Sequence, residues 1–315
     1  MKFRPFIVLL VLISFASLNS PVFGWNARGH MMVAGAAYQH LTRRTKDRVD
    51  KLLALNPDLP NWLKLIPDGT SDADKKMMIF MIAATWADRI KGNHDYHSDG
   101  SHGGNRPPED ASANNNLGYT DFAMHKYWHF IDIPFSSDGS PLPGVPKPNA
   151  ETRIDDFRKV LRSNKPDALK SYDLTWLLHL IGDIHQPLHG TTRVTAAKPD
   201  GDDGGNGVTL SGPIHNLHSY WDDLLGIGDS PLEAQQALAA LPKAAATSSD
   251  LKTANWVKES FSAAKSVVYM NPPIGPGNGP FTLTPGYEAK AHEVAAARVS
   301  LAGARLAKIL NKELK

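Results

Sequence analysis

The chain has no cysteine among its 315 residues. No disulfide therefore stabilises the fold, and no thiolate serves as a nucleophile or a metal ligand. Cysteine-based structural zinc sites are excluded for the same reason. Only histidine, carboxylate and backbone atoms remain to bind a metal ion.

A long apolar run occurs only at the beginning of the chain. Residues 6–15 are apolar and follow the basic residues Lys2 and Arg4. With small residues just before Trp25, this pattern predicts a secretory signal peptide over residues 1–24 that is removed by cleavage. The run is short for a membrane span, which makes an uncleaved anchor the less favoured alternative. We expect a secreted or periplasmic protein without stable membrane association.

An excess of positive charge is also missing. Two of the 34 Lys and Arg residues and none of the 32 Asp and Glu residues lie in residues 1–24, which leaves residues 25–315 balanced at 32 of each sign. Nucleic-acid-binding domains commonly carry a basic surface. If this chain binds phosphate, we expect bound cations and local lysines to attract it.

Alternating β-branched residues, typical of strands, are nearly absent outside residues 208–210. Apolar residues instead recur at helical spacing, and no repeat or polar linker divides residues 25–315. The sequence therefore predicts a single all-α domain of packed helices. The predicted helices cover residues 31–41, 43–55, 71–90, 151–162, 173–184, 214–225, 231–241, 251–269 and 287–310. The predicted long loops, of a length that is usually functional or mobile, cover residues 94–117, 138–149 and 196–207.

Two His-x3-Asp pairs are the most informative feature: His179 with Asp183, and His218 with Asp222. Residues four apart lie on one face of a helix, so each pair can share a metal ion. His189 lies between the pairs, after a proline that ends the first helix. A single pair occurs by chance on many helices. Two pairs with a histidine between them indicate more than one metal ion.

Further candidate ligands lie near predicted helix ends. Asp88 belongs to the end of residues 71–90, His129 lies in an aromatic segment, and His30 follows Trp25 by five residues. Zinc accepts imidazole nitrogen and carboxylate oxygen. For any one histidine taken alone, a hydrogen-bonded position in the core is the more common role.

Four other histidines are interpreted as non-ligands. His94, His97 and His102 lie in a polar loop, where solvent exposure is expected. His185 is two residues past Asp183 and so points to another helix face, which favours a structural role or a hydrogen bond to a ligand.

In their order along the chain, these motifs resemble the zinc-dependent class I nucleases. This family comprises fungal, plant and bacterial single-strand-specific nucleases and 3′-nucleotidases, and its superfamily includes zinc phospholipase C. The resemblance runs from Trp25 to about Asp223. It rests on Trp-Asn-Ala-Arg-Gly-His, Trp-Ala-Asp, Trp-His-Phe-Ile-Asp, His-x3-Asp-x5-His and His-x3-Asp.

The resemblance implies three zinc ions per chain, held by eight side chains and the amino terminus. The first zinc takes Asp88, His129, His179 and one oxygen of Asp183; the second takes His189, His218 and Asp222; the third takes His30, the other oxygen of Asp183, and the α-amino nitrogen and carbonyl oxygen of Trp25. The α-amine exists only after the signal peptide has been removed, and it must lose its proton to bind.

The implied reaction is hydrolysis of phosphodiester bonds in single-stranded DNA and RNA to 5′-phosphate products, with 3′-nucleotidase activity as a further expectation. Zinc lowers the pKa of bound water toward ~7 and stabilises attacking and leaving oxygens. By resemblance, Asp88 orients the attacking water, Asp183 is shared between metal ions, and Lys91 neutralises the transition-state phosphate. The alternative for Lys91 is a solvated lysine at a helix end.

By resemblance, Phe130 stacks on a base and Asp132 accepts hydrogen bonds from its edge. Stacking contributes ~1–3 kcal/mol per base and tolerates any sequence, which favours unpaired strands or nucleotides as substrates. The alternative for Phe130 is a core position. No obligate protein partner is predicted.

Two other functions remain open at this point. A zinc phospholipase C shares the metal ligands, but its second pair resembles His-x3-Glu rather than the pair that ends in Asp222. A non-catalytic exported zinc-binding protein would leave Lys91 and Phe130 without a role.

Overall fold

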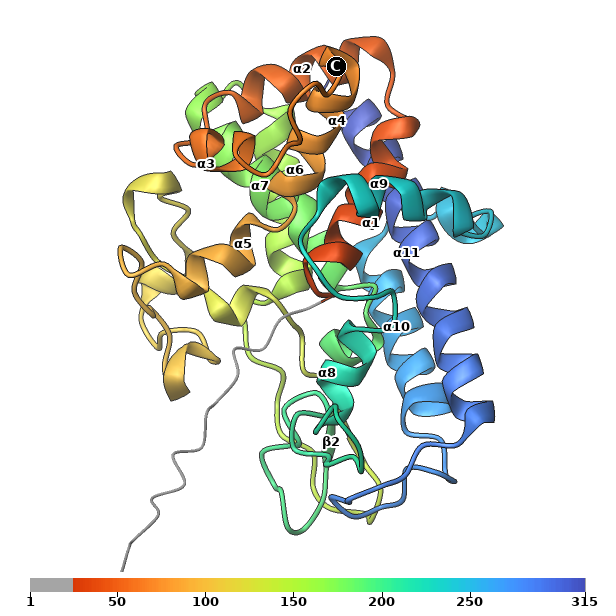
Figure 1. The fold of residues 1–315 in the computed structure, drawn as a ribbon. Coiled ribbons are helices and arrows are strands. Elements are labelled where there is room, and N and C mark those ends of the chain that lie inside the picture. Colours follow the sequence, from red (N-terminus) through yellow and green to blue (C-terminus); the bar gives the residue numbers. More distant parts are fainter. Residues whose placement is uncertain (1–24, 315) are drawn as a thin grey trace, which may run out of the picture.

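The computed structural model describes residues 25–314, so the predicted signal peptide lies outside the described residues. Helices dominate this part of the chain, which confirms the all-α class (Figure 1). They are α1 (Ala27–Gln39), α2 (Arg43–Leu53), α3 (Leu59–Leu63), α4 (Asp72–Ala83), α5 (Trp86–Arg89), α6 (Ala150–Arg162), α7 (Asp167–Asp183), α8 (Leu217–Asp222), α9 (Pro231–Ala237), α10 (Thr253–Ala263) and α11 (Pro285–Glu313).

Helix α7 is the central element. Every residue from Lys170 to Asp183 is buried, because α1, α2, α5, α6 and α11 all pack against it. Helix α1 packs in turn against α4, α9 and α11, and the buried apolar side chains of these elements form one core cluster. A helix that is surrounded in this way holds its side chains in fixed positions.

Some predicted helices are shorter in the structure than the sequence pattern suggests. The predicted helix over residues 71–90 is interrupted between α4 and α5, and the Ala84 carbonyl at this break accepts a hydrogen bond from His179 over 2.7 Å. The predicted helix over residues 214–225 is reduced to α8. Asn216 caps α8 by accepting from the backbone N–H of Ser219, and Thr209 pairs with Asn216 as an isolated bridge.

A parallel strand pair, which the sequence pattern did not indicate, ties two distant segments together. Strand β1 (Pro134–Ser136) pairs with β2 (Thr192–Val194). Just before these strands, the N–H of Ile131 donates to the carbonyl of His189 over 2.9 Å. The segments that contain His129 and His189 are therefore fixed side by side.

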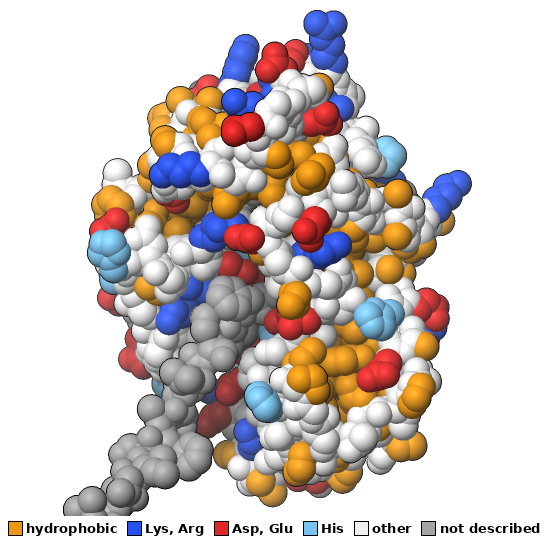
Figure 2. Space-filling view, in the orientation of Figure 1, with side chains coloured by type: hydrophobic (Ala, Val, Ile, Leu, Met, Phe, Trp, Pro, Cys, Tyr) orange, Lys and Arg blue, Asp and Glu red, His pale blue; other side chains and the backbone are white. Residues whose placement is uncertain are grey.

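On the face drawn in Figure 2, basic and acidic side chains are interspersed, and neither kind forms a large patch. This agrees with the balanced charge of the sequence. Among residues 25–314, no helix combines the length and the apolar character that a membrane span requires.

Candidate metal centre

The first ligand group consists of Asp88, His129, His179 and Asp183. Nδ1 of His129, Nε2 of His179 and Oδ2 of Asp183 lie 3.0–3.1 Å from one another. Oδ1 of Asp88 lies 3.6 Å from Nε2 of His179 and 3.8 Å from Nδ1 of His129. A tetrahedral zinc ion with ligands at about 2.0 Å separates them by roughly 3.3 Å. The three atoms of His129, His179 and Asp183 therefore converge as the ligands of one cation do, and Oδ1 of Asp88 lies beside them.

The second group consists of His189, His218 and Asp222. Nδ1 of His189 donates to the carbonyl of His129 and Nδ1 of His218 to the carbonyl of Gly204, both over 2.7 Å. In each neutral imidazole, Nε2 is then the nitrogen with a lone pair. The two Nε2 atoms lie 3.2 Å apart, and Oδ2 of Asp222 lies 3.4 Å from Nε2 of His218. Electron-pair donors that converge in this way fit a shared cation.

The third group joins α1 to the centre. Nε2 of His30 lies 3.3 Å from Oδ1 of Asp183, and both ring nitrogens of His30 are buried with no hydrogen-bond partner among the described residues. The backbone N–H of Asn26 donates to the carbonyl of Asp222 over 3.3 Å, which holds the segment after Trp25 against α8. Ligation by the Trp25 α-amine depends on cleavage of the bond to residues 1–24, which lie outside the described part of the chain.

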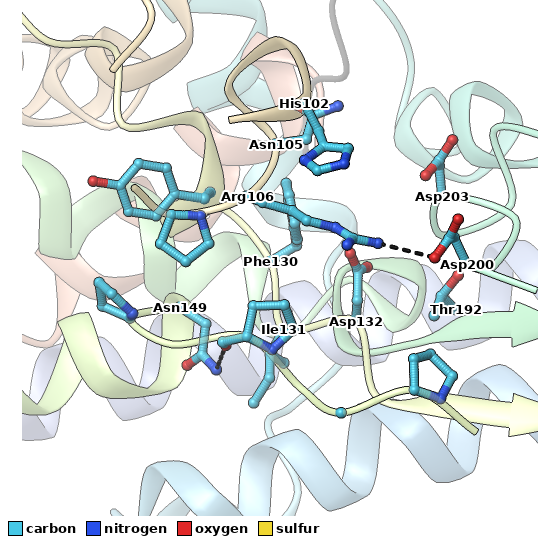
Figure 3. A pocket seen from close by; sticks show the side chains of 16 residues that line it. His102, Asn105, Arg106, Phe130, Ile131, Asp132, Asn149, Thr192, Asp200 and Asp203 are labelled. Carbon is cyan, nitrogen blue, oxygen red and sulfur yellow. Dashed lines mark hydrogen bonds and ion pairs between the residues drawn. The ribbon is translucent and has the colours of Figure 1, made fainter. Parts of the chain in front are cut away.

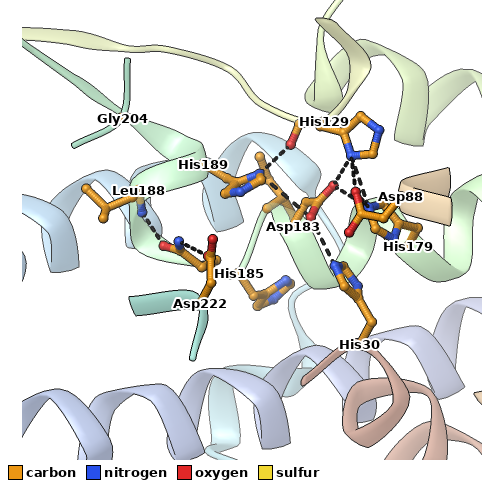
Figure 4. A network of polar contacts seen from close by, with 12 residues as sticks. His30, Asp88, His129, His179, Asp183, His185, Leu188, His189, Gly204 and Asp222 are labelled. Carbon is orange, nitrogen blue, oxygen red and sulfur yellow. Dashed lines mark hydrogen bonds and ion pairs between the residues drawn. The ribbon is translucent and has the colours of Figure 1, made fainter. Parts of the chain in front are cut away.

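Asp183 lies at the centre of these groups, as Figure 4 shows. Its Oδ1 faces His30 and its Oδ2 faces the first group. Ligand atoms of His30, Asp88 and His179 also lie within 4.8 Å of one another. Adjacent cations that share one carboxylate suit this arrangement.

Hydrogen bonds from outside the ligand set orient the imidazoles and one carboxylate. Backbone carbonyls accept from Nδ1 of His179, His189 and His218. Gln186 donates to Oδ1 of Asp222 over 2.8 Å and accepts from the N–H of Leu188 over 2.5 Å. Partners of this kind fix the ring orientation of metal-ligating residues.

The loop before α8 owes its shape to Asp202. This buried carboxylate accepts hydrogen bonds from the N–H groups of Arg193 and Gly205 and from the hydroxyl of Tyr269, at 2.9–3.1 Å. Gly204, with a φ of 59°, leaves no room for a side chain, since a Cβ would lie 2.6 Å from a backbone oxygen. Asp202 thereby holds the Gly204 carbonyl against His218.

Lys91 is buried rather than solvated, with a side chain that is 5% exposed. Its Nζ donates to Oδ1 of Asp88 over 2.8 Å. Burial alone raises the pKa of the Asp88 carboxyl, but the charges of Lys91 and the nearby histidines outweigh it and bring the pKa to about 2. Burial and Lys91 lower the pKa of His129 to about 3, so this imidazole is neutral and able to bind a cation.

A pocket of about 440 Å³ with a mixed polar and apolar lining begins directly after His129 (Figure 3). Phe130 and Asp132 line it, and Phe130 is only partly buried, so it is not an interior core residue. Burial, with the negative charges of Asp203 and Asp202, raises the pKa of Asp132 to about 7, while Arg106 opposes the rise. Loops on several sides contribute the remaining lining, which includes His102, Asn105, Asn149, Thr192 and Asp200.

The four histidines interpreted as non-ligands belong to none of these ligand groups. His94, His97 and His102 are exposed. His185 is buried, donates from Nδ1 to the carbonyl of Ile181, and contacts Arg305 through Nε2 at 2.9 Å. Its position is structural.

The sequence interpretation missed Gln186, Asp202 and Arg106. In the same loop as Asp202, Asn206 donates to the carbonyl of Asp203, and Asp203 lines the pocket. The available signal for Asp202 was the Gly-Gly pair that begins two residues after it, because an Asp before glycines is typical of a tight turn around its carboxylate. Gln186 and Arg106 have no comparable signal.

Two comparisons with known proteins agree with this geometry. The family model described as S1/P1 Nuclease matches residues 25–315. The chain is also similar to Nuclease S1 of Aspergillus oryzae (strain ATCC 42149 / RIB 40), with 27% identity over 219 residues that cover 65% of this chain and 56% of that protein. The matched region thus spans little more than half the length of this relative.

Proposed function

The chain belongs to the S1/P1 nuclease family, and on this premise we propose that it is a metal-dependent nuclease that hydrolyses phosphodiester bonds. The observation that carries the proposal is the convergence of three buried His and Asp groups beside the pocket that Phe130 and Asp132 line. Preference for single-stranded DNA and RNA, 5′-phosphate products and 3′-nucleotidase activity are finer parts of the same proposal.

We assign one zinc ion to each of the three ligand groups, because zinc accepts the imidazole nitrogen and carboxylate oxygen that these groups offer. The residues that would hold them are Asp88, His129, His179 and Asp183; His189, His218 and Asp222; and His30, Asp183 and the freed terminus of Trp25. When bound, zinc would lower the pKa of a water molecule toward about 7 and stabilise charge on the reacting oxygens.

The side chains around the centre have complementary tasks. Asp88 accepts a hydrogen bond from the attacking water and so orients it toward phosphorus. Lys91, held 2.8 Å from Asp88, donates to the phosphate oxygens as their charge increases in the transition state. Pre-positioned charge of this kind needs no reorganisation during the reaction.

The pocket is the proposed base site. Phe130 supplies a stacking surface, and Asp132, which is ionised above a pKa of about 7, accepts hydrogen bonds from the base edge. A duplex hides the faces of its bases, so an unpaired strand enters the pocket at lower cost.

Export is part of the proposal, since the α-amine of Trp25 becomes available only when residues 1–24 are removed. A secreted or periplasmic protein that begins at Trp25 is the form that carries the complete ligand set. No stable membrane association and no obligate protein partner are proposed for it.

The test combines metal analysis with activity on the mature protein. We expect about three zinc ions per chain, cleavage of single-stranded DNA and RNA, loss of cleavage with a chelator, and recovery with zinc. Hydrolysis of phosphatidylcholine without nucleic-acid cleavage would identify a phospholipase C instead. Bound zinc without any turnover would identify a storage or delivery protein. Equal rates on single strands and duplexes would contradict the stacking role of Phe130.

Replacing Lys91 by Met is expected to lower kcat by about 10²-fold or more, with KM changed less than about threefold. The neutral side chain keeps the volume but no longer stabilises the transition-state phosphate, and a lost donor of this kind costs ~10²–10³-fold. Steady-state kinetics on a single-stranded oligonucleotide measures both constants. Lys64→Met, at an exposed position, is the control. A wild-type kcat with wild-type zinc content would rule out the role of Lys91.

A further inference from the structure

Arg106 spans the mouth of the pocket that Phe130 and Asp132 line. One guanidinium nitrogen, Nη2, lies 3.4 Å from Oδ1 of Asp200 in another of the lining loops. Figure 3 shows the side chain reaching past Asp132 toward Asp200. The long loop predicted over residues 94–117 therefore contributes a wall of the proposed base site.

The backbone of Arg106 is held in place by a local turn. Its N–H donates to the carbonyl of Ser101 over 3.2 Å, and its carbonyl accepts from the N–H of Ser101 over 2.9 Å. Gly100 packs so closely that a Cβ there would lie 2.3 Å from the carbonyl oxygen of Arg106. The backbone from which the Arg106 side chain reaches into the pocket is therefore held in place.

The ion pair with Asp200 leaves the guanidinium able to turn toward a ligand. The two side chains are 42% and 82% exposed, and ion pairs in such surroundings contribute little to stability. A guanidinium offers five N–H donors in a planar arrangement. Arg106 can thus donate two parallel hydrogen bonds to a planar ligand beneath it.

Arg106 and Asp132 together present a donor group and an acceptor group to one base. Guanine matches both, because its O6 and N7 accept from arginine in bidentate geometry while its N1–H and amino group donate to a carboxylate. Adenine has an amino group in place of O6, and the pyrimidines lack N7. We infer that Arg106 makes the pocket selective for guanine. This inference rests on the proposed nuclease function, with a base held against Phe130.

The experiment uses zinc-loaded mature protein and single-stranded oligothymidylates that contain one guanine, adenine or 7-deazaguanine. Cleavage rates are measured by competition at the linkages on both sides of that base. The wild type is expected to cleave next to guanine about tenfold or more faster than next to adenine, the range of one bidentate contact. The 7-deazaguanine substrate, which lacks the N7 acceptor, should lose most of this advantage.

Arg106→Gln is expected to remove the preference for guanine, because the glutamine amide matches the N6 and N7 edge of adenine rather than the O6 and N7 edge of guanine. This variant should also cleave next to guanine and next to 7-deazaguanine at the same rate. The contact that the 7-deaza substitution removes is already absent, and the effects of two changes to one contact do not add. Arg106→Lys keeps the charge without the bidentate geometry and should behave like the Gln variant. Arg44→Gln, at an exposed position on α2, is the matched control and should keep the preference.

Three results would overturn the inference. Equal wild-type rates next to guanine and adenine would show that the pocket does not distinguish them. A rate loss in Arg106→Gln that is the same for every base would assign Arg106 to the phosphate backbone. Absence of cleavage at all linkages would contradict the proposed nuclease function itself, and it is distinguished from the first two results because no substrate reacts.

Discussion

Asp183→Asn is expected to reduce nuclease activity by about 10³-fold or more and to lower the zinc content by at least one ion per chain. The two oxygens of Asp183 face different ligand groups: Oδ1 lies 3.3 Å from Nε2 of His30, and Oδ2 lies 3.1 Å from Nε2 of His179. Asparagine keeps the shape but has one oxygen and no charge. Metal ions supply several kcal/mol to such reactions, and each ~1.4 kcal/mol is a factor of ten in rate.

The matched control is Asp167→Asn on the same helix. Asp167 lies at the opposite end of α7, where it is half exposed and pairs with Arg48. Loss of this surface pair should cost less than about 1 kcal/mol of stability and leave activity and zinc content unchanged. Zinc is counted by elemental analysis, and the fold is checked by thermal unfolding. An Asp183→Asn protein with full zinc content and more than a tenth of the wild-type activity would contradict the shared-ligand role.

Gly182→Ala is expected to lower activity by about 10- to 100-fold and to deplete one zinc ion. A Cβ at this position would lie 2.7 Å from Nδ1 of His30 and 3.0 Å from its Cε1, so the imidazole has to move away from Asp183. Disturbing the packing that orients a metal ligand typically has effects of this size. The measurement is zinc stoichiometry together with kcat/KM on a single-stranded oligonucleotide.

Gly286→Ala provides the comparison, because nothing lies within 4 Å of a Cβ at that position in α11. The same substitution without a steric conflict should stabilise the protein by about 0.4–1 kcal/mol and leave turnover unchanged. If Gly182→Ala instead has wild-type zinc content and turnover, the observed position of His30 is not required for the centre.

The helix-based part of the site was predictable from the sequence. His179 and Asp183 face the same way because four residues make about one turn of α7, and the same holds for His218 and Asp222 on α8. The all-α class followed from apolar spacing in long segments such as α7 and α11. In these segments, helix geometry and the burial of one face require the same spacing of residues along the sequence.

The rest depends on contacts between segments that are distant in the sequence. Placement of His30 beside Asp183 requires α1 to cross α7, and no local signal specifies that crossing. The pairing of β1 with β2 involves three residues on each side, too few to produce an alternating pattern. Lys91 was equally compatible with solvent and with burial, because the burial of a helix-end residue is decided by what packs over it.

The hydrogen bonds that orient three of the imidazoles all end on main-chain oxygens, those of Ala84, His129 and Gly204. Every amino acid supplies such an oxygen, so mutation can alter these positions without deleting the acceptor. Alanine substitutions at these three positions therefore leave the acceptor oxygens in place. Only an ester in place of the peptide bond, or a change in the backbone path, would weaken these hydrogen bonds. Ligand groups that are oriented by main-chain oxygens can keep their geometry while the surrounding side chains change in evolution.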